Sequence, residues 1–316
     1  MATYLVTGGA GFIGSNIVDE LLKRGARVRV LDNFSTGRED NVQEFASRVD
    51  LIRGDVRDED AVDRAVKGVD YVLHQAALAS VPRSIADPTS NNQVNAQGTL
   101  NILLAAKKHG VKRLVYASSS SVYGDSEELP KVETMIPNPK SPYAVAKLAA
   151  EYYCRVFGEL YGVPTVSLRY FNVFGPRQDP NSQYSAVIPL FVKALLEGKS
   201  PNIYGDGEQS RDFTFISNVV NANLLACEAN VTGARVYNIA CGGRYTLNQL
   251  FAALRERIGG NVEPVYGPPR AGDVKHSMAG IERIQRELGY QVGTSFEEGI
   301  DRTVQWYQTV GLKTLG

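Results

Sequence analysis

The stretch that decides the fold of this chain is residues 7–14, which read Thr7-Gly8-Gly9-Ala10-Gly11-Phe12-Ile13-Gly14. An apolar run at residues 3–7 precedes it, and an amphipathic run at 15–23 follows. Glycines at this spacing permit a tight turn, close approach of a phosphate to the backbone and close packing of a helix on a strand. The unpaired N–H groups at the start of the helix then attract phosphate charge. The stretch therefore predicts a dinucleotide-binding βαβ unit whose cofactor contacts are Gly8, Gly11, Phe12, Ile13 and Gly14.

The same alternation of short apolar runs and amphipathic stretches continues through the first half of the chain. It predicts further strands at 27–31, 50–53, 71–73, 113–117 and 165–169, and helices at 60–66 and 97–108. Strands that alternate with helices are typical of a parallel, doubly wound α/β sheet of the Rossmann type. From about residue 175 the pattern changes, because segments rich in Pro, Gly, Asn and Asp separate helices expected at 187–197, 219–228 and 247–258.

Two lobes follow from this change of pattern. We expect a dinucleotide-binding domain over residues 1–174 and a smaller α/β substrate-binding lobe over 175–316, with the chain crossing between them. No internal repeat or long linker separates the two, so we expect them to pack around a cleft.

An acidic residue indicates which dinucleotide is bound. Asp32 lies 18 positions beyond Gly14 and ends the second predicted strand. Its carboxylate is suited to accept hydrogen bonds from the adenosine ribose hydroxyls and would repel a 2′-phosphate, which favours NAD over NADP. Further cofactor contacts are expected where the next strands end, at Asn33, Ser35, Thr36, Gly37, Asp55, Val56, Gln75, Ala76 and Ala77. Asp55 is suited to the adenine amino group, and the small residues after the fourth strand let a cofactor lie close to the backbone.

Composition excludes several other classes of protein. The 316 residues contain 34 Lys and Arg and 34 Asp and Glu, so the net charge is zero and a basic groove for nucleic acid is not expected. The three cysteines are isolated, and the three histidines are far apart, so we expect no disulfide framework and no metal site. No apolar run approaches the ~18 residues that a membrane span needs. The chain is therefore expected to be cytoplasmic, with no membrane partner.

A second constellation indicates proton transfer. Tyr143 and Lys147 are four residues apart at the start of a predicted helix that runs to about residue 161, so their side chains share one face. An ammonium beside a phenol lowers the pKa of the phenol toward working pH, and a bound NAD⁺ adds to this effect. The predicted fifth strand runs into Ser118-Ser119-Ser120-Ser121, and hydroxyls at the carboxyl end of a parallel strand face the crevice where ligands bind.

Together these motifs resemble the extended short-chain dehydrogenase/reductase superfamily, with its TGxxGxxG and YxxxK motifs. More narrowly, the chain resembles the UDP-hexose 4-epimerases over nearly its whole length. It is most similar to those that accept UDP-N-acetylglucosamine, through three segments: 169–180, reading RYFNVFGPRQDP; 210–213, reading SRDF; and 270–277, reading RAGDVKHS.

The resemblance implies roles for individual residues. Tyr143 is the expected base, and Lys147 is its partner. The catalytic hydroxyl is expected at Ser119 or Ser120, because the run of four serines does not show which of the two takes this position. Further cofactor contacts are implied at Asn95, Ser118 and Val173. The UDP-sugar is expected to contact Ser80, Ser119, Ser120, Tyr143, Asn172, Ala186, Val187, Tyr204, Arg211, Arg270, Asp273 and Ser277. The two arginines are suited to bidentate phosphate contact. A small residue at 277 implies room for an N-acetyl group at the sugar C2, and the family implies a homodimer that pairs the helices at 97–108 and 143–161.

Other functions were weighed against this one. A sugar-nucleotide 4,6-dehydratase needs an Asp-Glu pair where Ser120-Ser121 stand. An epimerase or decarboxylase of UDP-glucuronate needs an additional cation for the sugar carboxylate, and the segments around Asn172 and Ser277 favour it less. An NAD-bound regulatory protein without catalysis would be expected to lack Tyr143 or Lys147.

Overall fold

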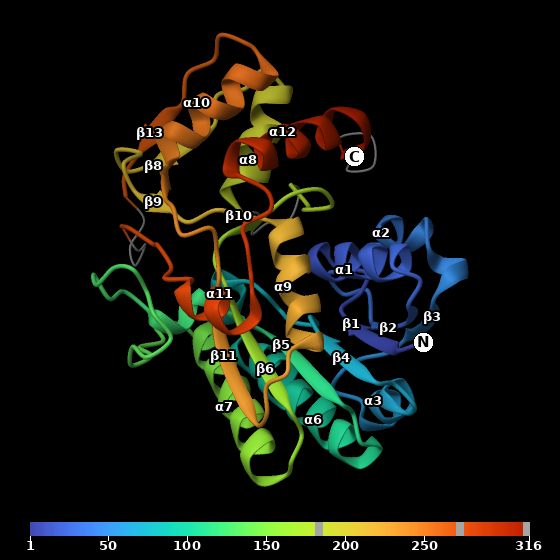
Figure 1. Ribbon diagram of the computed structural model, residues 1–316. Helices are drawn as coiled ribbons and strands as arrows, with labels where there is room; N and C mark the ends of the chain where they lie inside the picture. Colours follow the sequence, from blue (N-terminus) through green and yellow to red (C-terminus); the bar gives the residue numbers. More distant parts are fainter. Residues whose placement is uncertain (181–185, 270–274, 312–316) are drawn as a thin grey trace.

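Seven parallel strands form the central sheet, in the order β11-β6-β5-β4-β1-β2-β3. This computed structural model describes residues 1–180, 186–269 and 275–311 (Figure 1). The strands of the sheet are β1 (Thr3–Thr7), β2 (Arg27–Asp32), β3 (Asp50–Arg53), β4 (Tyr71–His74), β5 (Arg113–Ser119), β6 (Thr165–Tyr170) and β11 (Ala234–Ile239). The order reverses direction between β1 and β4, and in open α/β sheets ligands bind at the carboxyl ends of the strands at such a point.

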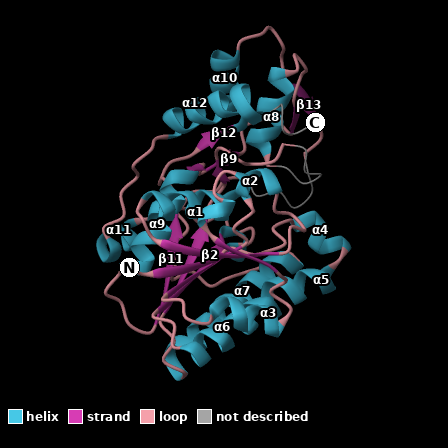
Figure 2. Ribbon diagram, turned by 90° about the vertical axis from the view of Figure 1, so that its right-hand side faces the viewer, coloured by secondary structure: helices cyan, strands magenta, loops and turns pink. Residues whose placement is uncertain are grey.

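Helices cover both faces of the sheet, as Figure 2 shows. One face carries α3 (Glu59–Val66), α6 (Gly98–His109) and α7 (Pro142–Leu160); the other carries α1 (Phe12–Lys23), α9 (Ile216–Glu228) and α11 (Glu282–Leu288). Side chains alternate between the two faces along each strand. Leu5 and Leu114 accordingly belong to one buried apolar cluster, and Val6 and Val115 to the other.

Shorter helices flank the sheet at its binding edge. They are α2 (Glu39–Gln43), α4 (Val81–Ala86) and α5 (Pro88–Asn92), followed by one π-helical turn at Gln93–Gln97 that leads into α6. Proline fixes φ and lacks an N–H, so it is favoured in the first turn of a helix. This accounts for Pro88 at the start of α5 and Pro142 at the start of α7.

The smaller lobe lies above the carboxyl ends of the sheet strands, at the top of Figure 1. It contains α8 (Val187–Leu196), α10 (Leu247–Ile258) and α12 (Phe296–Trp306), with three two-stranded pairs. These pairs are β7 (Val173–Phe174) with β10 (Thr214–Phe215), β9 (Ser210–Arg211) with β12 (Tyr245–Thr246), and β8 (Asn202–Tyr204) with β13 (Val265–Gly267). Buried Phe191 and Leu250 join its helices to the core cluster that also fills the α1 side of the sheet.

The α/β class and the parallel, doubly wound sheet expected from the sequence are confirmed. Strand β11 was not expected from the sequence, because residues 234–239 (ARVYNI) do not alternate strictly between apolar and polar. The six short strands of the smaller lobe were not expected either, because two- or three-residue strands carry no periodic signal. Helix α1 begins at Phe12 rather than at residue 15, since its first turn is the end of the glycine stretch itself. Within the described residues, no helix is both long and apolar enough to span a membrane.

Candidate active site

The glycine loop is shaped by contacts that exclude any side chain. Gly8 has a φ of +69°, and a Cβ on it would lie 2.7 Å from the Ala76 nitrogen. A Cβ on Gly14 would lie only 2.1 Å from the Gly8 carbonyl oxygen. The loop thus turns tightly against the end of β4, and α1 starts directly behind it, so that its first turn lines a cavity in a position suited to bind phosphate.

Asp32 holds this loop in place. Its Oδ2 accepts a hydrogen bond from the Ala10 N–H at 2.9 Å, and its Oδ1 accepts one from the Phe34 N–H at 2.8 Å. Burial raises the pKa of the carboxyl, and the two N–H donors act against this shift. Each carboxylate oxygen keeps a further lone pair, so Asp32 can still accept from ribose hydroxyls. Gly37 packs against the same carboxylate, where a Cβ would come within 2.9 Å of Oδ1.

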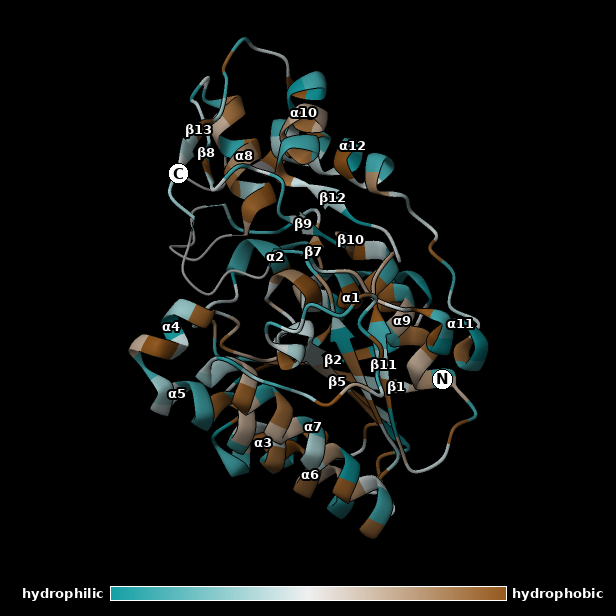
Figure 3. Ribbon diagram, turned by 90° about the vertical axis from the view of Figure 1, so that its left-hand side faces the viewer, coloured by the Kyte–Doolittle hydropathy of each residue, from teal (hydrophilic) through white to brown (hydrophobic). Residues whose placement is uncertain are grey.

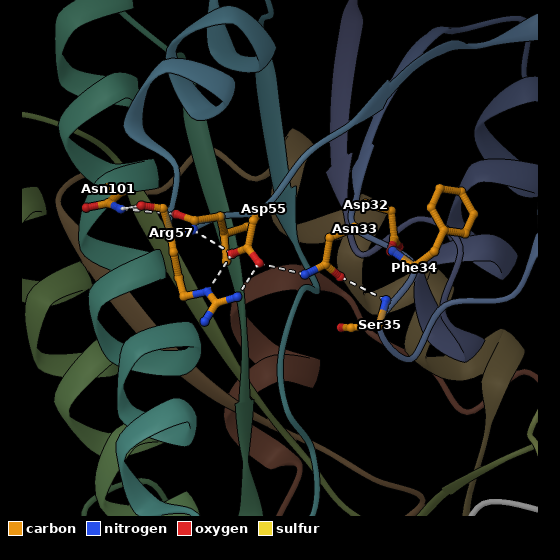
Figure 4. Close-up of polar contacts among 8 residues, drawn as sticks. Asp32, Asn33, Phe34, Ser35, Asp55, Arg57 and Asn101 are labelled. Carbon is orange, nitrogen blue, oxygen red and sulfur yellow. Dashed lines mark hydrogen bonds and ion pairs between the residues drawn. The ribbon is translucent and has the colours of Figure 1, made fainter.

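The end of the site expected to hold adenine is a polar cluster at the ends of β2 and β3 (Figure 4). The Asn33 amide donates to Asp55 at 2.7 Å, and the Arg57 guanidinium donates to both Asp55 oxygens at 3.0 and 2.7 Å. The hydrogen bonds from Arg57 lower the pKa of Asp55 to about 2. Asp55 therefore stays ionised and oriented, and any adenine contact must use its remaining lone pairs.

These elements enclose a cavity of about 280 Å³. The cavity brings together fourteen of the cofactor residues expected from the sequence: Gly8, Gly11, Phe12, Ile13, Gly14, Asp32, Asn33, Ser35, Thr36, Asp55, Val56, Gln75, Ala76 and Ala77. Asn95 lies behind this wall, where its amide accepts from the Leu78 N–H at 2.9 Å and donates to the Leu78 carbonyl at 3.2 Å. It thus fixes the loop after β4 that lines the cavity. A dinucleotide fits this lining, because the first turn of α1 offers N–H groups suited to phosphate and Asp32 offers a carboxylate suited to ribose hydroxyls.

The proposed proton-transfer residues converge where β5 meets the start of α7. Ser141 caps α7, accepting from the Ala144 N–H at 3.2 Å, which places Tyr143 in the first turn. Lys147 lies one turn further; its ammonium donates to the Ala117 carbonyl at 2.8 Å and lies 5.9 Å from the centroid of the Tyr143 ring. Ser119, the last residue of β5, lies close enough to Tyr143 to lower the pKa of its phenol.

The electrostatics of this group differ from the simple expectation. Burial lowers the pKa of Lys147 to about 7, and burial raises the pKa of Tyr143, against a smaller opposite effect of the Ser119 hydrogen bond. The expectation that Lys147 lowers the Tyr143 pKa is therefore not met by the protein alone. Removal from water disfavours both charged forms, so an additional positive charge is needed to favour the phenolate.

The serines at 118–121 differ in their surroundings. Ser118 points into the α7 side, where its hydroxyl donates to Glu151 at 2.8 Å, so that hydroxyl does not face the cleft. Ser119 accepts from the Ser121 N–H at 3.2 Å and contacts Tyr143. Ser120 begins the 3₁₀ turn at Ser120–Tyr123. Of the two candidates for the catalytic hydroxyl, Ser119 is the one with a contact to Tyr143.

A second cavity, of about 620 Å³, lies between the loop after β6 and the smaller lobe. Among the residues expected at a substrate, it is lined by Asn172, Val173, Ala186, Val187, Tyr204 and Arg211. Val173, expected at the cofactor, thus lines this cavity instead of the first. Asn172 has a φ of +33°, and its amide donates to the Asp212 carbonyl at 3.2 Å. Arg211 donates to the Ser210 and Lys275 carbonyls.

The other expected substrate residues lie elsewhere. Ser80 caps α4, accepting from the Arg83 N–H at 3.1 Å. The Ser277 N–H donates to the Ser210 carbonyl at 3.0 Å, so Ser277 adjoins β9 but is not among the residues lining the cavity. Arg270 and Asp273 lie outside the described residues. Gln209 and Lys193 also line the cavity but were not expected from the sequence, because no motif marks them and only the fold brings Lys193 of α8 and Gln209 before β9 to one cavity.

Within the described parts of the chain, no cluster of three or more potential metal ligands occurs. The fold and site therefore define a class: an α/β protein with a cavity at its glycine loop and, at the end of β5, a Tyr, a Lys and a Ser that lie outside the lining of that cavity. A family model described as "NAD dependent epimerase/dehydratase family" matches residues 4–240. The chain belongs to this family, which extends over most of its length.

Several individual proteins that are similar to this chain are UDP-sugar 4-epimerases. The chain is 42% identical to a UDP-N-acetylglucosamine 4-epimerase from Methanobrevibacter ruminantium, solved with UDP-N-acetylmuramic acid, with a TM-score of 0.93 over 98% of both chains. It is 40% identical to a UDP-glucose 4-epimerase from Thermotoga maritima, solved with UDP-glucose, with a TM-score of 0.92 over 99% of this chain and 100% of that one. A UDP-glucose 4-epimerase of Mycolicibacterium smegmatis is 37% identical over 96% of this chain and 98% of its own. Sugar-nucleotide decarboxylases and a dTDP-glucose 4,6-dehydratase also match, at 31% to 33% identity.

Proposed function

We propose that this protein is a UDP-sugar 4-epimerase that uses tightly held NAD. The observation that carries the proposal is the convergence of Tyr143, Lys147 and Ser119 at the end of β5, the strand next to β4, whose following loop lines the cavity at the glycine loop. When bound, NAD⁺ supplies a reversible hydride acceptor. We further propose that residues 1–174 hold the cofactor and residues 175–316 hold the UDP-sugar, with β11 crossing back into the large sheet.

The roles of the residues follow from their chemistry. Tyr143, as the phenolate, accepts the proton of the sugar 4-hydroxyl and later returns it, as a general base and acid. Lys147 stabilises the phenolate by its charge, and Ser119 hydrogen-bonds at the same oxygen. The site has to retain the 4-keto sugar while this intermediate rotates, because the two faces of C4 must face the cofactor in succession.

The alternative reaction of the same family is elimination of water, as in the 4,6-dehydratases. That reaction needs an acid and a base near C5 and C6. Ser120 and Ser121 stand where those enzymes carry Asp and Glu, and a hydroxyl of ordinary pKa serves neither role well. Product analysis after incubation with UDP-glucose, UDP-N-acetylglucosamine and UDP-glucuronate, without added NAD, tests the choice. We expect the 4-epimers; a 4-keto-6-deoxy sugar or a pentose would overturn the proposal.

We propose that the N-acetylated pair, UDP-N-acetylglucosamine and UDP-N-acetylgalactosamine, is accepted together with UDP-glucose and UDP-galactose. Small side chains support this: Ala186 lines the substrate cavity, and Ser277 lies beside β9, next to the cavity residue Arg211. Ser277→Tyr is expected to abolish turnover of the acetylated sugars and to leave UDP-glucose turnover largely intact, since a clash affects only the larger ligand. Steady-state rates on both substrates check this, and equal losses on both would contradict it.

We also propose a homodimer built on α6 and α7. These two helices carry exposed apolar side chains, which we call the α6/α7 stripe: Leu104 on α6, and Val145, Tyr152, Tyr153, Val156 and Leu160 on α7. Figure 3 shows apolar segments along both helices. Contiguous exposed apolar surface of this kind marks a protein interface. Sedimentation of the protein and of Val156→Glu tests it, with a dimer expected for the first and a monomer for the second; a monomeric parent protein would refute it.

A cytoplasmic location completes the proposal. Cys154, Cys227 and Cys241 are all free thiols in the structure. Free buried cysteines are compatible with a reducing compartment, where disulfides are rare.

A further inference from the structure

A buried ion pair lies directly behind the proton-transfer residues. The Arg169 guanidinium of β6 donates to both oxygens of Glu151 of α7, at 3.0 and 2.5 Å, and both side chains are almost fully buried, at 4% and 3% exposure. The Glu151 oxygen at 3.0 Å from Arg169, Oε2, also accepts a hydrogen bond from the Ser118 hydroxyl at 2.8 Å. Ser118 and Arg169 are direct neighbours across β5 and β6. Neither charged residue touches the cavities described above, and the proposed reaction does not use them.

The pair is joined to the site by the geometry of α7. Tyr143, Lys147 and Glu151 recur every four residues, so they lie on one face of the helix. Each contacts a different residue of β5. Lys147 binds the Ala117 carbonyl, Glu151 binds the Ser118 hydroxyl and Tyr143 contacts Ser119. The buried carboxylate is thus one of three side-chain ties that hold α7 against β5.

We propose that Glu151 and Arg169 are positioning residues for the proton transfer: together they fix α7 against β5, and by neutralising each other they keep the field at Tyr143 set by Lys147. This inference rests on the proposed function of Tyr143 as the base. A single buried charge left without its partner keeps its field, because little solvent is present to screen it. Loss of Arg169 and loss of Glu151 therefore shift the titration of Tyr143 in opposite directions. A pair with a purely structural role would not produce opposite shifts.

Several other titratable groups face the pair or its neighbours. Burial holds the pKa of the Tyr116, Tyr123 and Cys154 groups above their usual values and lowers that of His74 to about 3. Glu133 faces Tyr123 from the loop before α7. Arg169 also donates to the Tyr123 hydroxyl at 2.9 Å. Lys147, next to Tyr143, has a pKa of about 7. An unpaired charge at Glu151 or Arg169 moves the pKa of Lys147 in the same direction as the pKa of Tyr143.

The size of the effect follows from the helix. Eight residues separate Tyr143 from Glu151, a rise of about 12 Å. At an effective dielectric constant of about 20, a unit charge at that distance moves a titration by about one pH unit. Arg169→Met leaves the Glu151 carboxylate unpaired, so the rising limb of the activity profile is expected to move up in pH. Glu151→Gln leaves the guanidinium unpaired and keeps an oxygen acceptor for Ser118, so the limb is expected to move down.

Two measurements are made on each variant of the full-length protein: the pH dependence of kcat, and the tyrosinate absorbance titration taken as the difference from the same variant carrying Tyr143→Phe. The second does not depend on turnover. If the chain proves to lack epimerase activity, the tyrosinate titration still decides whether the pair controls Tyr143. The double variant Glu151→Gln with Arg169→Met carries no unpaired charge, and its titration is expected to return to the position of the unaltered protein.

The matched control changes the same charges on an exposed helix pair. Glu20→Gln and Arg24→Met break the 2.8 Å ion pair on the surface of α1, where solvent screens the charge, and no shift is expected. Shifts of the Tyr143 titration in the same direction in both buried single variants, or no shift, would overturn the proposal. An unpaired buried charge is strongly destabilising, and Arg169→Met can fail to fold for this reason. In that case the Tyr143 titration of Glu151→Gln alone tests the proposal, and a titration that is unmoved or shifted to higher pH refutes the proposal.

Discussion

Asp212 carries a stability prediction that can be worked out from its contacts. The residue follows β9, is fully buried, and accepts three backbone hydrogen bonds: from Cys241 at 3.0 Å, Gly242 at 3.1 Å and Ala279 at 3.2 Å. It therefore joins the strand that carries Arg211 to the chain after β11 and to the segment after Ser277. No basic side chain pairs with it in these contacts. Burial raises its pKa from 3.8 to about 6, because the three N–H donors offset only part of the lost hydration.

The sign follows from proton binding. Between pH 4 and 6 the folded protein keeps the Asp212 proton and the unfolded chain has released it, so the folded state binds more protons and its stability falls as pH rises. A pKa raised from 3.8 to about 6 corresponds to about 3 kcal/mol of stability present at low pH and lost by pH 7. Asp212→Asn cannot titrate. The free energy of unfolding of the parent protein minus that of Asp212→Asn is expected to fall by about 2.4 kcal/mol from pH 4 to pH 7, because the unfolded carboxyl is still partly protonated at pH 4.

The assay is denaturant unfolding of both proteins across that pH range. Other carboxyl groups and histidines titrate in the same range, but they are common to both proteins and cancel in the difference. A constant offset is also expected, since the Asn amide presents an NH₂ group toward one of the three N–H donors, and an unsatisfied buried donor costs about 1–3 kcal/mol. That offset does not depend on pH. A difference that stays flat, or rises with pH, would refute the assignment of a raised pKa to Asp212.

The remaining predictions concern the active site. Tyr143→Phe is expected to keep its fold and bound NAD and to lose epimerisation by a factor of about 10² or more; near-normal turnover would refute its role as base. Lys147→Ala is expected to move the activity profile to higher pH and to weaken NAD retention, both readable from pH–rate curves and from nucleotide released on acid extraction. Asp32→Ala is expected to erode the preference for NAD, and NADP released from the unaltered protein would contradict the reasoning. Gly14→Ala places a Cβ against the Gly8 carbonyl, so loss of bound NAD and about 1–3 kcal/mol of stability are expected in a thermal unfolding assay.

The features predictable from sequence were those with local signals. The glycine stretch determined the first βαβ unit, because its glycines are required by contacts within a few residues, such as that of Gly14 with Gly8. The helical spacing of Tyr143 and Lys147 likewise predicted their shared face. The placement of Ser119 rather than Ser120 against Tyr143 was not predictable, because it depends on where β5 ends and the 3₁₀ turn begins.

Features built from distant segments carried no such signal. Glu151 reads as an ordinary helix residue; only the pairing of β5 with β6 brings Arg169 to it. Asp212 lies in a motif that the sequence analysis quoted, yet its three donors come from residues 241, 242 and 279. The pKa of Tyr143 was expected to fall beside Lys147, and it rises instead, because burial cannot be judged from a spacing of four residues.

The late position of β11 in the chain has a consequence for synthesis on the ribosome. β6 ends at Tyr170 and its outer neighbour β11 begins at Ala234, so 63 residues (171–233) must be made before the sheet receives its last strand. At about 5–20 residues per second, β6 presents an open edge for roughly 3 to 13 seconds. Unpaired strand edges recruit other chains, and all six residues of β6 are buried in the finished protein. A nascent chain paused between residues 171 and 233 is therefore the form of this protein most exposed to aggregation, and the one for which a chaperone at the ribosome exit would matter most.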